Sequence, residues 1–213
     1  MMTTELPDTR AGRIDWVIRA PDNAEMRLRY DIWAQAYDAD VGSSDDYLAP
    51  MQTAKAAKGV FDPDARIMDA GAGTGLLGET LKQEGFLNLV AVDYAAEMLE
   101  IARGKDLYSE IHTCDLSAPT EFGTNSFDGV VSCGTTSQMP SASLREFARI
   151  VRPGGAIVFA VVPEPWQDCG YADIYSDLHQ AGQLSLQSRG APFQMMPTTE
   201  PEFMCEICVM DVH

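Results

Sequence analysis

The stretch RIMDAGAGTGLLGETL, residues 66–81, decides the fold of this 213-residue chain. A short apolar run leads directly into Gly71, Gly73 and Gly75, and an amphipathic segment follows them. Glycine lets a ligand approach the backbone closely, and the first turn from strand to helix is the usual floor of the binding site in an open parallel sheet. The stretch therefore predicts a strand, a ligand-binding turn and a helix.

Strands and helices alternate after this turn. Apolar runs of strand length occupy residues 89–94, 110–116, 127–133 and 155–162, and helical patterns occupy residues 95–104, 141–151 and 171–182. This order predicts a parallel sheet with helices on both faces. Residues 184–189 and 202–212 form two further strands, because the connection between them has no room for a crossover helix. The expected fold is α/β, with a Rossmann-like, seven-stranded, mostly parallel sheet and a C-terminal antiparallel hairpin.

The length of the chain favours a single domain. Residues 1–60 are expected to form an N-terminal helical cap within that domain, with helices near residues 23–39 and 45–60. Residues 61–213 are expected to form the Rossmann-like core.

The composition is strongly acidic, with 15 Lys and Arg against 32 Asp and Glu and a formal charge of −17. Such a surface repels phosphate backbones and anionic lipid. Nucleic acid is therefore disfavoured as a substrate, a small-molecule acceptor is favoured, and a basic protein substrate is compatible. The sequence has neither an apolar run of membrane-helix length nor the pattern of a secretion signal, which predicts a cytoplasmic protein without a membrane span. The oligomeric state does not follow from the sequence.

The five cysteines are an odd number, which argues against a disulfide framework. Cys205 and Cys208 have the spacing of a metal or redox pair, yet they lie in a run of β-forming residues. Residues three apart on a strand point to opposite faces. We therefore expect both cysteines to be structural.

The spacing of the glycines can be compared with the motifs that bind triphosphates and dinucleotides. A P-loop ends in Gly-Lys-Ser or Gly-Lys-Thr, whereas Leu76 follows Gly75 here. A dinucleotide fold needs G-x-G-x-x-G, and Leu76 stands where its third glycine belongs. A nicotinamide-dependent oxidoreductase remains an alternative.

Three carboxylates favour a cationic adenosine derivative. Asp93 closes the second strand, where a carboxylate can accept both hydroxyls of an adenosine ribose. Asp115 closes the third strand and can accept from an adenine amino group. Asp69, just before the glycines, disfavours a pyrophosphate and suits a ligand that carries an ammonium or sulfonium group.

These residues resemble class I S-adenosylmethionine-dependent methyltransferases. The resemblance covers IMDAGAGTG, VAVDYAAEMLEIAR, CDLSAPTEFGTNSFDGVVSCG and LREFARIVRPGGAIVFAV, in this order within residues 65–162. The earlier stretch RYDIWAQAYDADV, residues 29–41, resembles a methyltransferase-like subgroup named after a Williams-Beuren syndrome region protein. The resemblance implies methyl transfer from S-adenosylmethionine, with S-adenosylhomocysteine as product, to an oxygen, nitrogen or sulfur atom of a small molecule. A non-catalytic module that binds the cofactor is a further alternative.

The resemblance also implies which residues hold the cofactor. They are Asp69, Gly71, Gly73 and Gly75 at the methionine part, Asp93 and Tyr94 at the ribose, Asp115 and Leu116 at the adenine, Cys133 and Gly134 under the methyl group, and Ala72 and Met98 as further cofactor-binding residues. Aromatic residues of an N-terminal helix often close over the cofactor in such families, which makes Tyr30, Trp33 and Tyr37 candidates. Because they share one helical face, they fit ordinary core packing equally well.

Catalysis of this kind depends mainly on alignment of the acceptor, so a dedicated base is optional. His179 is the candidate base. Cys133 stands where metal-dependent catechol-type enzymes carry an aspartate, so no metal is expected. The fourth strand also lacks the Asn-Pro-Pro-Tyr or Asp-Pro-Pro-Tyr motif of amine-methylating families that act on nucleic acids and glutamine. The candidate walls of the substrate pocket are Trp166, Phe193, Met195 and Met196.

Overall fold

The computed structural model describes residues 5–42, 46–135 and 138–213. Its central sheet has the strand order β3-β2-β1-β4-β5-β8-β6, with β7 paired to β8 outside this path. The strands are β1 (Arg66–Ala70), β2 (Asn88–Asp93), β3 (Glu110–Thr113), β4 (Phe127–Ser132), β5 (Val151–Val161), β6 (Leu184–Arg189), β7 (Phe193–Met196) and β8 (Glu200–Val212). The helices are α1 (Arg10–Ile18), α2 (Asn23–Tyr37), a π-helical turn η1 (Asp38–Gly42), α3 (Ala49–Lys58), α4 (Leu76–Gln83), α5 (Ala96–Gly104), α6 (Ser143–Ile150), α7 (Pro163–Asp168) and α8 (Tyr171–Gln180).

The first five strands are parallel, β8 is antiparallel to β5, and β6 is antiparallel to β8. This arrangement confirms the predicted α/β fold with C-terminal antiparallel strands. The sheet has eight strands rather than the predicted seven. The additional strand β7 lies within residues 190–201, which were expected to form a loop, and it pairs with β8 through Phe193 and Cys205.

Helices cover both faces of the sheet, as expected for parallel strands. On one face, α6 and α8 bury Phe147, Ile150 and Tyr171 against strand residues that include Phe159. On the other face, α3 and α4 bury residues that include Leu81. The sheet therefore has one hydrophobic layer on each of its faces. Because both layers must stay buried, they fix the register of the strands.

Cys205 and Cys208 contribute to different layers of this core. Cys205 is buried in the layer under α3 and α4, and Cys208 is buried in the layer under α6 and α8. Both thiols are free. The prediction that they point to opposite faces as packing residues is confirmed.

The junction between α6 and β5 differs from the prediction. The helix was expected to end before Arg152 and Pro153, and the strand to begin near Gly155; instead α6 passes directly into β5 at Val151. The pairing of β5 with β4 shifts register here, because Val151 pairs with Phe127 and Ala156 pairs with Gly129. Between these two pairs β5 has more residues than β4, and the exposed residues 152–154 belong to this irregular part of the strand. A proline is tolerated at such a position.

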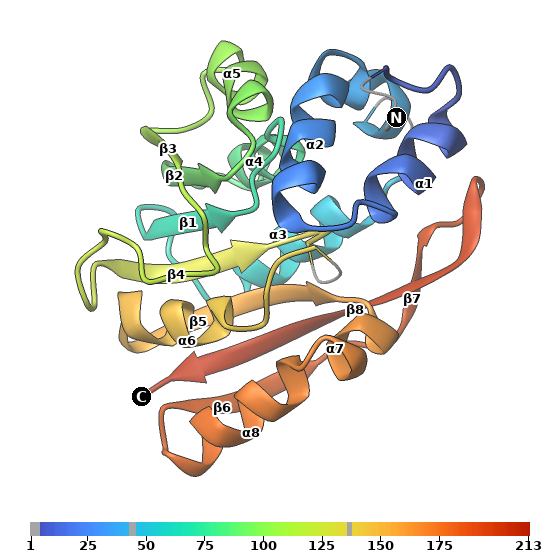
Figure 1. Ribbon diagram of the computed structural model, residues 1–213. Coiled ribbons are helices and arrows are strands. Elements are labelled where there is room, and N and C mark those ends of the chain that lie inside the picture. Colours follow the sequence, from blue (N-terminus) through green and yellow to red (C-terminus); the bar gives the residue numbers. More distant parts are fainter. Residues whose placement is uncertain (1–4, 43–45, 136–137) are drawn as a thin grey trace.

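The N-terminal helices lie beyond the carboxyl ends of β1 and β4, above the edge where parallel strands place a binding site (Figure 1). Helix α2 begins at Asp22, whose side chain accepts a hydrogen bond from the backbone N–H of Glu25 at 2.8 Å. Helix α1 was not predicted; its first turn is capped by Thr9. Across the described part of the chain, no helix has both the length and the apolar content needed to cross a membrane.

Candidate functional site

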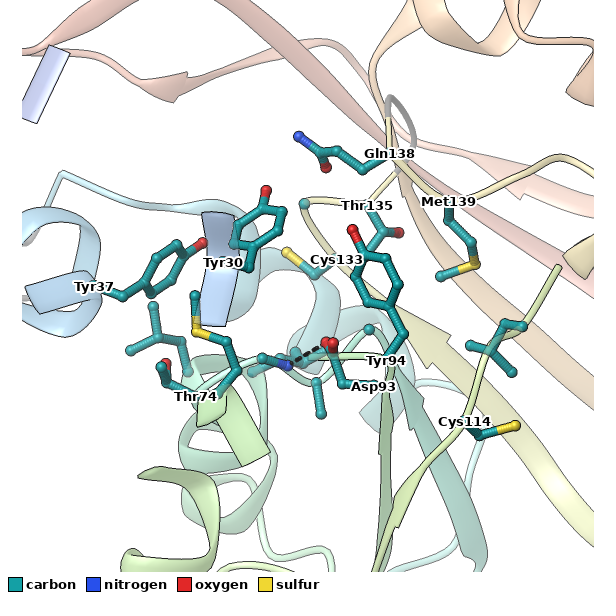
Figure 2. Close-up of a pocket in the computed structure, with 18 of the residues that line it drawn as sticks. Tyr30, Tyr37, Thr74, Asp93, Tyr94, Cys114, Cys133, Thr135, Gln138 and Met139 are labelled. Atoms are coloured by element: carbon teal, nitrogen blue, oxygen red, sulfur yellow. Dashed lines mark hydrogen bonds between the residues drawn. The ribbon is translucent and has the colours of Figure 1, made fainter. Parts of the chain in front are cut away.

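The glycine turn and the end of β2 are joined by a carboxylate. Asp93 Oδ2 accepts a hydrogen bond from the backbone N–H of Gly73 at 2.8 Å, and Asp93 Oδ1 accepts one from Ala95 at 2.8 Å. Figure 2 shows the first of these bonds as a dashed line at the base of the cavity. The turn therefore has a fixed position relative to the neighbouring strand.

A cavity of about 940 Å³, counting the part open to solvent, lies above this turn. The lining includes these sequence-predicted residues: Gly71, Ala72, Gly73, Asp93, Tyr94, Met98, Asp115, Leu116, Cys133, Gly134, Tyr30 and Tyr37. Figure 2 shows Tyr30 and Tyr37 on one side and Thr135 and Met139 on the other.

Two residues predicted at the methionine part of the cofactor lie outside this lining. Asp69 is buried, and its Oδ2 accepts a 2.7 Å hydrogen bond from the hydroxyl of Tyr108. Gly75 caps the start of α4, next to Leu107 and Tyr108. Both residues support the turn from behind rather than border the cavity.

Trp33 also lies outside the lining, although it shares a helical face with Tyr30 and Tyr37. It is buried, and its indole Nε1 donates a 2.6 Å hydrogen bond to Asp40 Oδ2. Its ring packs with Val17 and Met196. On this face of α2, Tyr30 and Tyr37 therefore line the cavity, whereas Trp33 packs in the core.

The residues proposed for the substrate pocket do not border the cavity. Trp166 stacks on Tyr171 with ring centroids 5.3 Å apart, in the core layer under α8. Phe193, Met195 and Met196 belong to β7 and pack under the N-terminal helices and α3. Their side chains contribute to the packing that supports the cap.

The structure does not bring His179 to the cavity. His179 lies near the end of α8, beside the edge strand β6 (Figure 1), where its Nδ1 is 3.0 Å from the carbonyl oxygen of Leu184. Its ring stacks on Tyr175. This placement explains His179 as part of the contact between α8 and β6.

Several lining residues were not predicted from the sequence. They are Asn23, Tyr47, Pro50, Thr74, Leu76, Leu77, Cys114, Thr135, Gln138, Met139 and Pro140. Thr74, Leu76 and Leu77 belong to the glycine stretch and could have been included with it. Asn23 and Pro50 lie in the first turns of α2 and α3, and the others come from connections whose path a local pattern does not determine.

Comparison with known proteins agrees with this geometry. Residues 68–159 match the family described as "Methyltransferase domain". The demethylmenaquinone methyltransferase of Clavibacter sepedonicus is 33% identical over 179 residues, which cover 78% of this chain and 71% of that protein. The chain belongs to the class I S-adenosylmethionine-dependent methyltransferases.

Other relatives of this methyltransferase have different names. Human methyltransferase-like protein 27 is 35% identical over 71% of this chain and 63% of its own length. Human probable tRNA methyltransferase 9B is 29% identical over 68% of this chain and 35% of its own length. The chain therefore spans less than two thirds of the length of these two relatives.

The fold has a close counterpart among solved structures. A TehB-like S-adenosylmethionine-dependent methyltransferase from Corynebacterium glutamicum superposes with a TM-score of 0.62, covering 86% of this chain and 98% of that chain at 20% identity. At this identity the likeness establishes the fold alone. With S-adenosylmethionine as the family's cofactor, the nicotinamide alternative is set aside.

The residues of the methyltransferase cavity fit that cofactor. No atom lies within 4 Å of the position that a Gly73 Cβ would occupy, and Gly73 has a φ of +54°, so the backbone there is open to a ligand. Each Asp93 oxygen accepts one backbone N–H and retains a lone pair for a ribose hydroxyl. Tyr94 Oη is buried without a hydrogen-bond partner among the described residues, and a bound ligand would supply one.

The electrostatics of the methyltransferase site favour a cation. Burial raises the pKa of Asp93 above its ordinary value, although the backbone N–H groups of Ala95 and Gly73 oppose the shift. Burial also raises the pKa of Tyr94, and the nearby Asp93 and Asp115 raise it further. S-adenosylmethionine, when bound, would supply a sulfonium that makes its methyl group electrophilic, and the negative charges of Asp93 and Asp115 in the cavity lining would favour such a cation.

Two lining groups, Cys133 and Tyr37, carry their protons at neutral pH. Burial raises the pKa of Cys133 to about 12 and holds the pKa of Tyr37 above its ordinary value. A neutral thiol and a neutral phenol act as hydrogen-bonding groups. The methyltransferase can therefore orient an acceptor here by contact and hydrogen bonding.

Proposed function

We propose that this methyltransferase transfers a methyl group to an oxygen, nitrogen or sulfur atom of a small-molecule acceptor. The observation that carries the proposal is the lining of the cavity, which combines two carboxylates with many uncharged side chains. The carboxylates are Asp93 and Asp115, which suit the hydroxyl and amino groups of a nucleoside. The uncharged residues that wall the rest of the cavity include Tyr37, Tyr47, Pro50, Cys133, Thr135, Gln138, Met139 and Pro140.

Such walls suit a small, largely apolar acceptor. The relative named as a demethylmenaquinone methyltransferase supports an acceptor with a flat quinone-type ring. The relative named as a probable tRNA methyltransferase supports a nucleic-acid acceptor instead. The formal charge of −17 favours the small molecule over a polyanion, because the surface repels phosphate.

Two narrower proposals accompany this one. The resemblance of residues 29–41 supports membership of the subgroup named after the Williams-Beuren syndrome region protein. Contacts of α2 with α5 and of α3 with α4 support one domain in which residues 1–60 cap the core formed by residues 61–213.

The test uses S-adenosylmethionine labelled in its methyl group. The purified protein is incubated with pools of phenols, amines and thiols, with total tRNA, and with a basic peptide, and label is measured in each product. We expect transfer to a member of the small-molecule pools. Transfer to tRNA or to the peptide alone contradicts the small-molecule proposal, and calorimetric binding of S-adenosylhomocysteine without any transfer indicates a non-catalytic module.

A further inference from the structure

Tyr47 lines the cavity from the connection between the N-terminal helices and α3. Its hydroxyl lies 3.6 Å from the Sγ of Cys133, the residue that follows β4. Sulfur is a weak hydrogen-bond partner. The Tyr47 hydroxyl can therefore exchange this contact for a stronger hydrogen bond to a molecule in the cavity.

Gly134 makes room for this hydroxyl. A Cβ on Gly134 would lie 2.6 Å from Tyr47 Oη, a distance that real Cβ contacts essentially never show. Gly134 also has a φ of +71°, which favours glycine. The floor of the cavity is therefore shaped around the tyrosine hydroxyl.

The residues on both sides of Tyr47 are fastened to the C-terminal hairpin. Asp46 accepts hydrogen bonds from the backbone N–H of Thr198 at 2.6 Å, the backbone N–H of Thr199 at 2.9 Å and the hydroxyl of Thr199 at 2.6 Å. On the other side, the backbone N–H of Leu48 donates to the carbonyl oxygen of Met195 at 3.0 Å. These bonds hold the backbone of Tyr47 in place, so the aim of its side chain is fixed by the strands β7 and β8.

We propose that Tyr47 positions the methyl acceptor and selects a flat aromatic compound that carries a hydroxyl group. The inference rests on the proposed function and names the acceptor class. Burial keeps the pKa of Tyr47 well above its ordinary value, so its hydroxyl can both donate and accept. Pro50, Met139 and Pro140 supply apolar walls to the same cavity, and a methionine sulfur packs well against an aromatic ring.

Through Tyr47, the β7–β8 hairpin contributes to the choice of methyl acceptor. Asp46 touches the turn at residues 198–199 and not the cavity. It is a positioning residue that acts through Tyr47. The sequence predicted Met195 and Met196 of the hairpin as walls of the acceptor pocket. Their side chains do not line the cavity, but the backbone of Met195 holds Leu48, the residue next to Tyr47, and so affects the pocket indirectly.

The test measures binding of two probes by calorimetry to the protein saturated with S-adenosylhomocysteine. One probe is 2-naphthol, and the other is its methyl ether, which lacks the O–H. We expect Tyr47→Phe to weaken 2-naphthol about tenfold, the loss of one hydrogen bond to a neutral partner, and to leave the ether unchanged. Asp46→Asn should weaken 2-naphthol as well, and both variants should bind S-adenosylhomocysteine within about threefold of wild type.

Asp128→Asn is the matched control for Asp46→Asn. Asp128 also accepts a backbone hydrogen bond, from Arg66 at 2.7 Å, but it lies on β4 near the amino ends of the strands. This variant should bind 2-naphthol as wild type does. An equal loss in Asp128→Asn and Asp46→Asn would overturn the positioning role of Asp46.

The remaining outcomes also decide the proposal. Equal affinity of wild type and Tyr47→Phe for 2-naphthol overturns the role of Tyr47. Failure of 2-naphthol to bind wild type overturns the acceptor class. In either case, intact binding of S-adenosylhomocysteine keeps the failure distinct from a failure of the proposed function, which would show instead as an absence of methyl transfer to every small-molecule pool.

Discussion

The hydroxyl of Tyr108 donates a 2.7 Å hydrogen bond to Asp69 Oδ2, directly behind the glycine turn. The second oxygen, Asp69 Oδ1, is buried without a hydrogen-bond partner among the described residues. An ionised carboxylate in such a place is poorly solvated. Burial accordingly raises the pKa of Asp69 to about 7, against the smaller lowering effect of the Tyr108 hydroxyl.

This pKa makes stability depend on pH. The folded protein binds the Asp69 proton more tightly than the unfolded chain, so the free energy of unfolding falls as the pH rises from about 4 to about 7, by roughly 4 kcal/mol if this group acts alone. Asp69→Asn removes this dependence. The difference in unfolding free energy between the variant and wild type, measured in urea at pH 5 and pH 8, should therefore favour the variant more at pH 8. Parallel pH profiles would contradict the raised pKa.

Gly73→Ala separates cofactor binding from folding. Gly73 has a φ of +54° and open space where a Cβ would lie, so alanine adds backbone strain of about 1 kcal/mol and a methyl group in the cavity. We expect the affinity for S-adenosylhomocysteine, measured by calorimetry, to fall at least about tenfold.

Gly85→Ala is the control for this change. Gly85 has a φ of +99° and equally open space, but it follows α4 and does not line the cavity. It should lose a similar amount of stability and keep its affinity. Equal affinities of the two variants would show that no ligand approaches the backbone at Gly73.

The parts of the site that the sequence predicted are those set by local pattern. Gly71 and Gly73 follow β1 directly, and Asp93 ends β2, so the order of strands alone brings them to one edge of the sheet. The register of β1 with β2 then places the glycine turn beside Asp93. The same alternation of apolar runs identified most strands and helices of the core.

The parts that the sequence did not predict depend on contacts between distant segments. Tyr47 reaches the cavity because Asp46 binds Thr198 and Thr199, more than 150 residues later. Strand β7 forms because the long strand β8 offers a second set of pairing groups beyond β5 and β6. The spacing of Tyr30, Trp33 and Tyr37 indicated one helical face, but it did not show that the indole would turn toward Asp40.

The two roles on that helical face give a paired prediction. Trp33→Phe removes the hydrogen bond to Asp40, which keeps its ion pair with Arg13 at 2.8 Å. We expect the free energy of unfolding to fall by about 1–3 kcal/mol and the affinity for S-adenosylhomocysteine to stay within threefold.

Tyr37→Leu should show the reverse pattern, because its ring lines the cavity while leucine keeps much of its apolar contact. Its affinity for S-adenosylhomocysteine should fall about tenfold with a smaller loss of stability. Chemical denaturation and calorimetry on both variants make the comparison. A larger affinity loss in the Trp33 variant would reverse the assignment of cavity and packing residues.

Asp93→Asn tests the position of the ribose. The asparagine keeps the shape of the side chain but loses the negative charge, and only one of its two terminal atoms can accept a hydrogen bond. The N–H of Gly73 or of Ala95 then loses its acceptor, and a ribose hydroxyl loses a charged partner. Two charge-assisted hydrogen bonds correspond to a loss of about 100-fold in affinity for S-adenosylhomocysteine.

Asp115→Asn is the matched change at the adenine end. Asp115 is exposed and its carboxylate accepts one backbone hydrogen bond, from Ser117 at 2.8 Å, so a loss of about tenfold in affinity with unchanged thermal stability is expected. Calorimetry gives both affinities, and circular dichroism confirms that each variant is folded. If Asp93→Asn binds S-adenosylhomocysteine as tightly as wild type, the ribose lies elsewhere in the cavity, because a buried carboxylate at the end of β2 could not lose its charge beside those hydroxyls without cost.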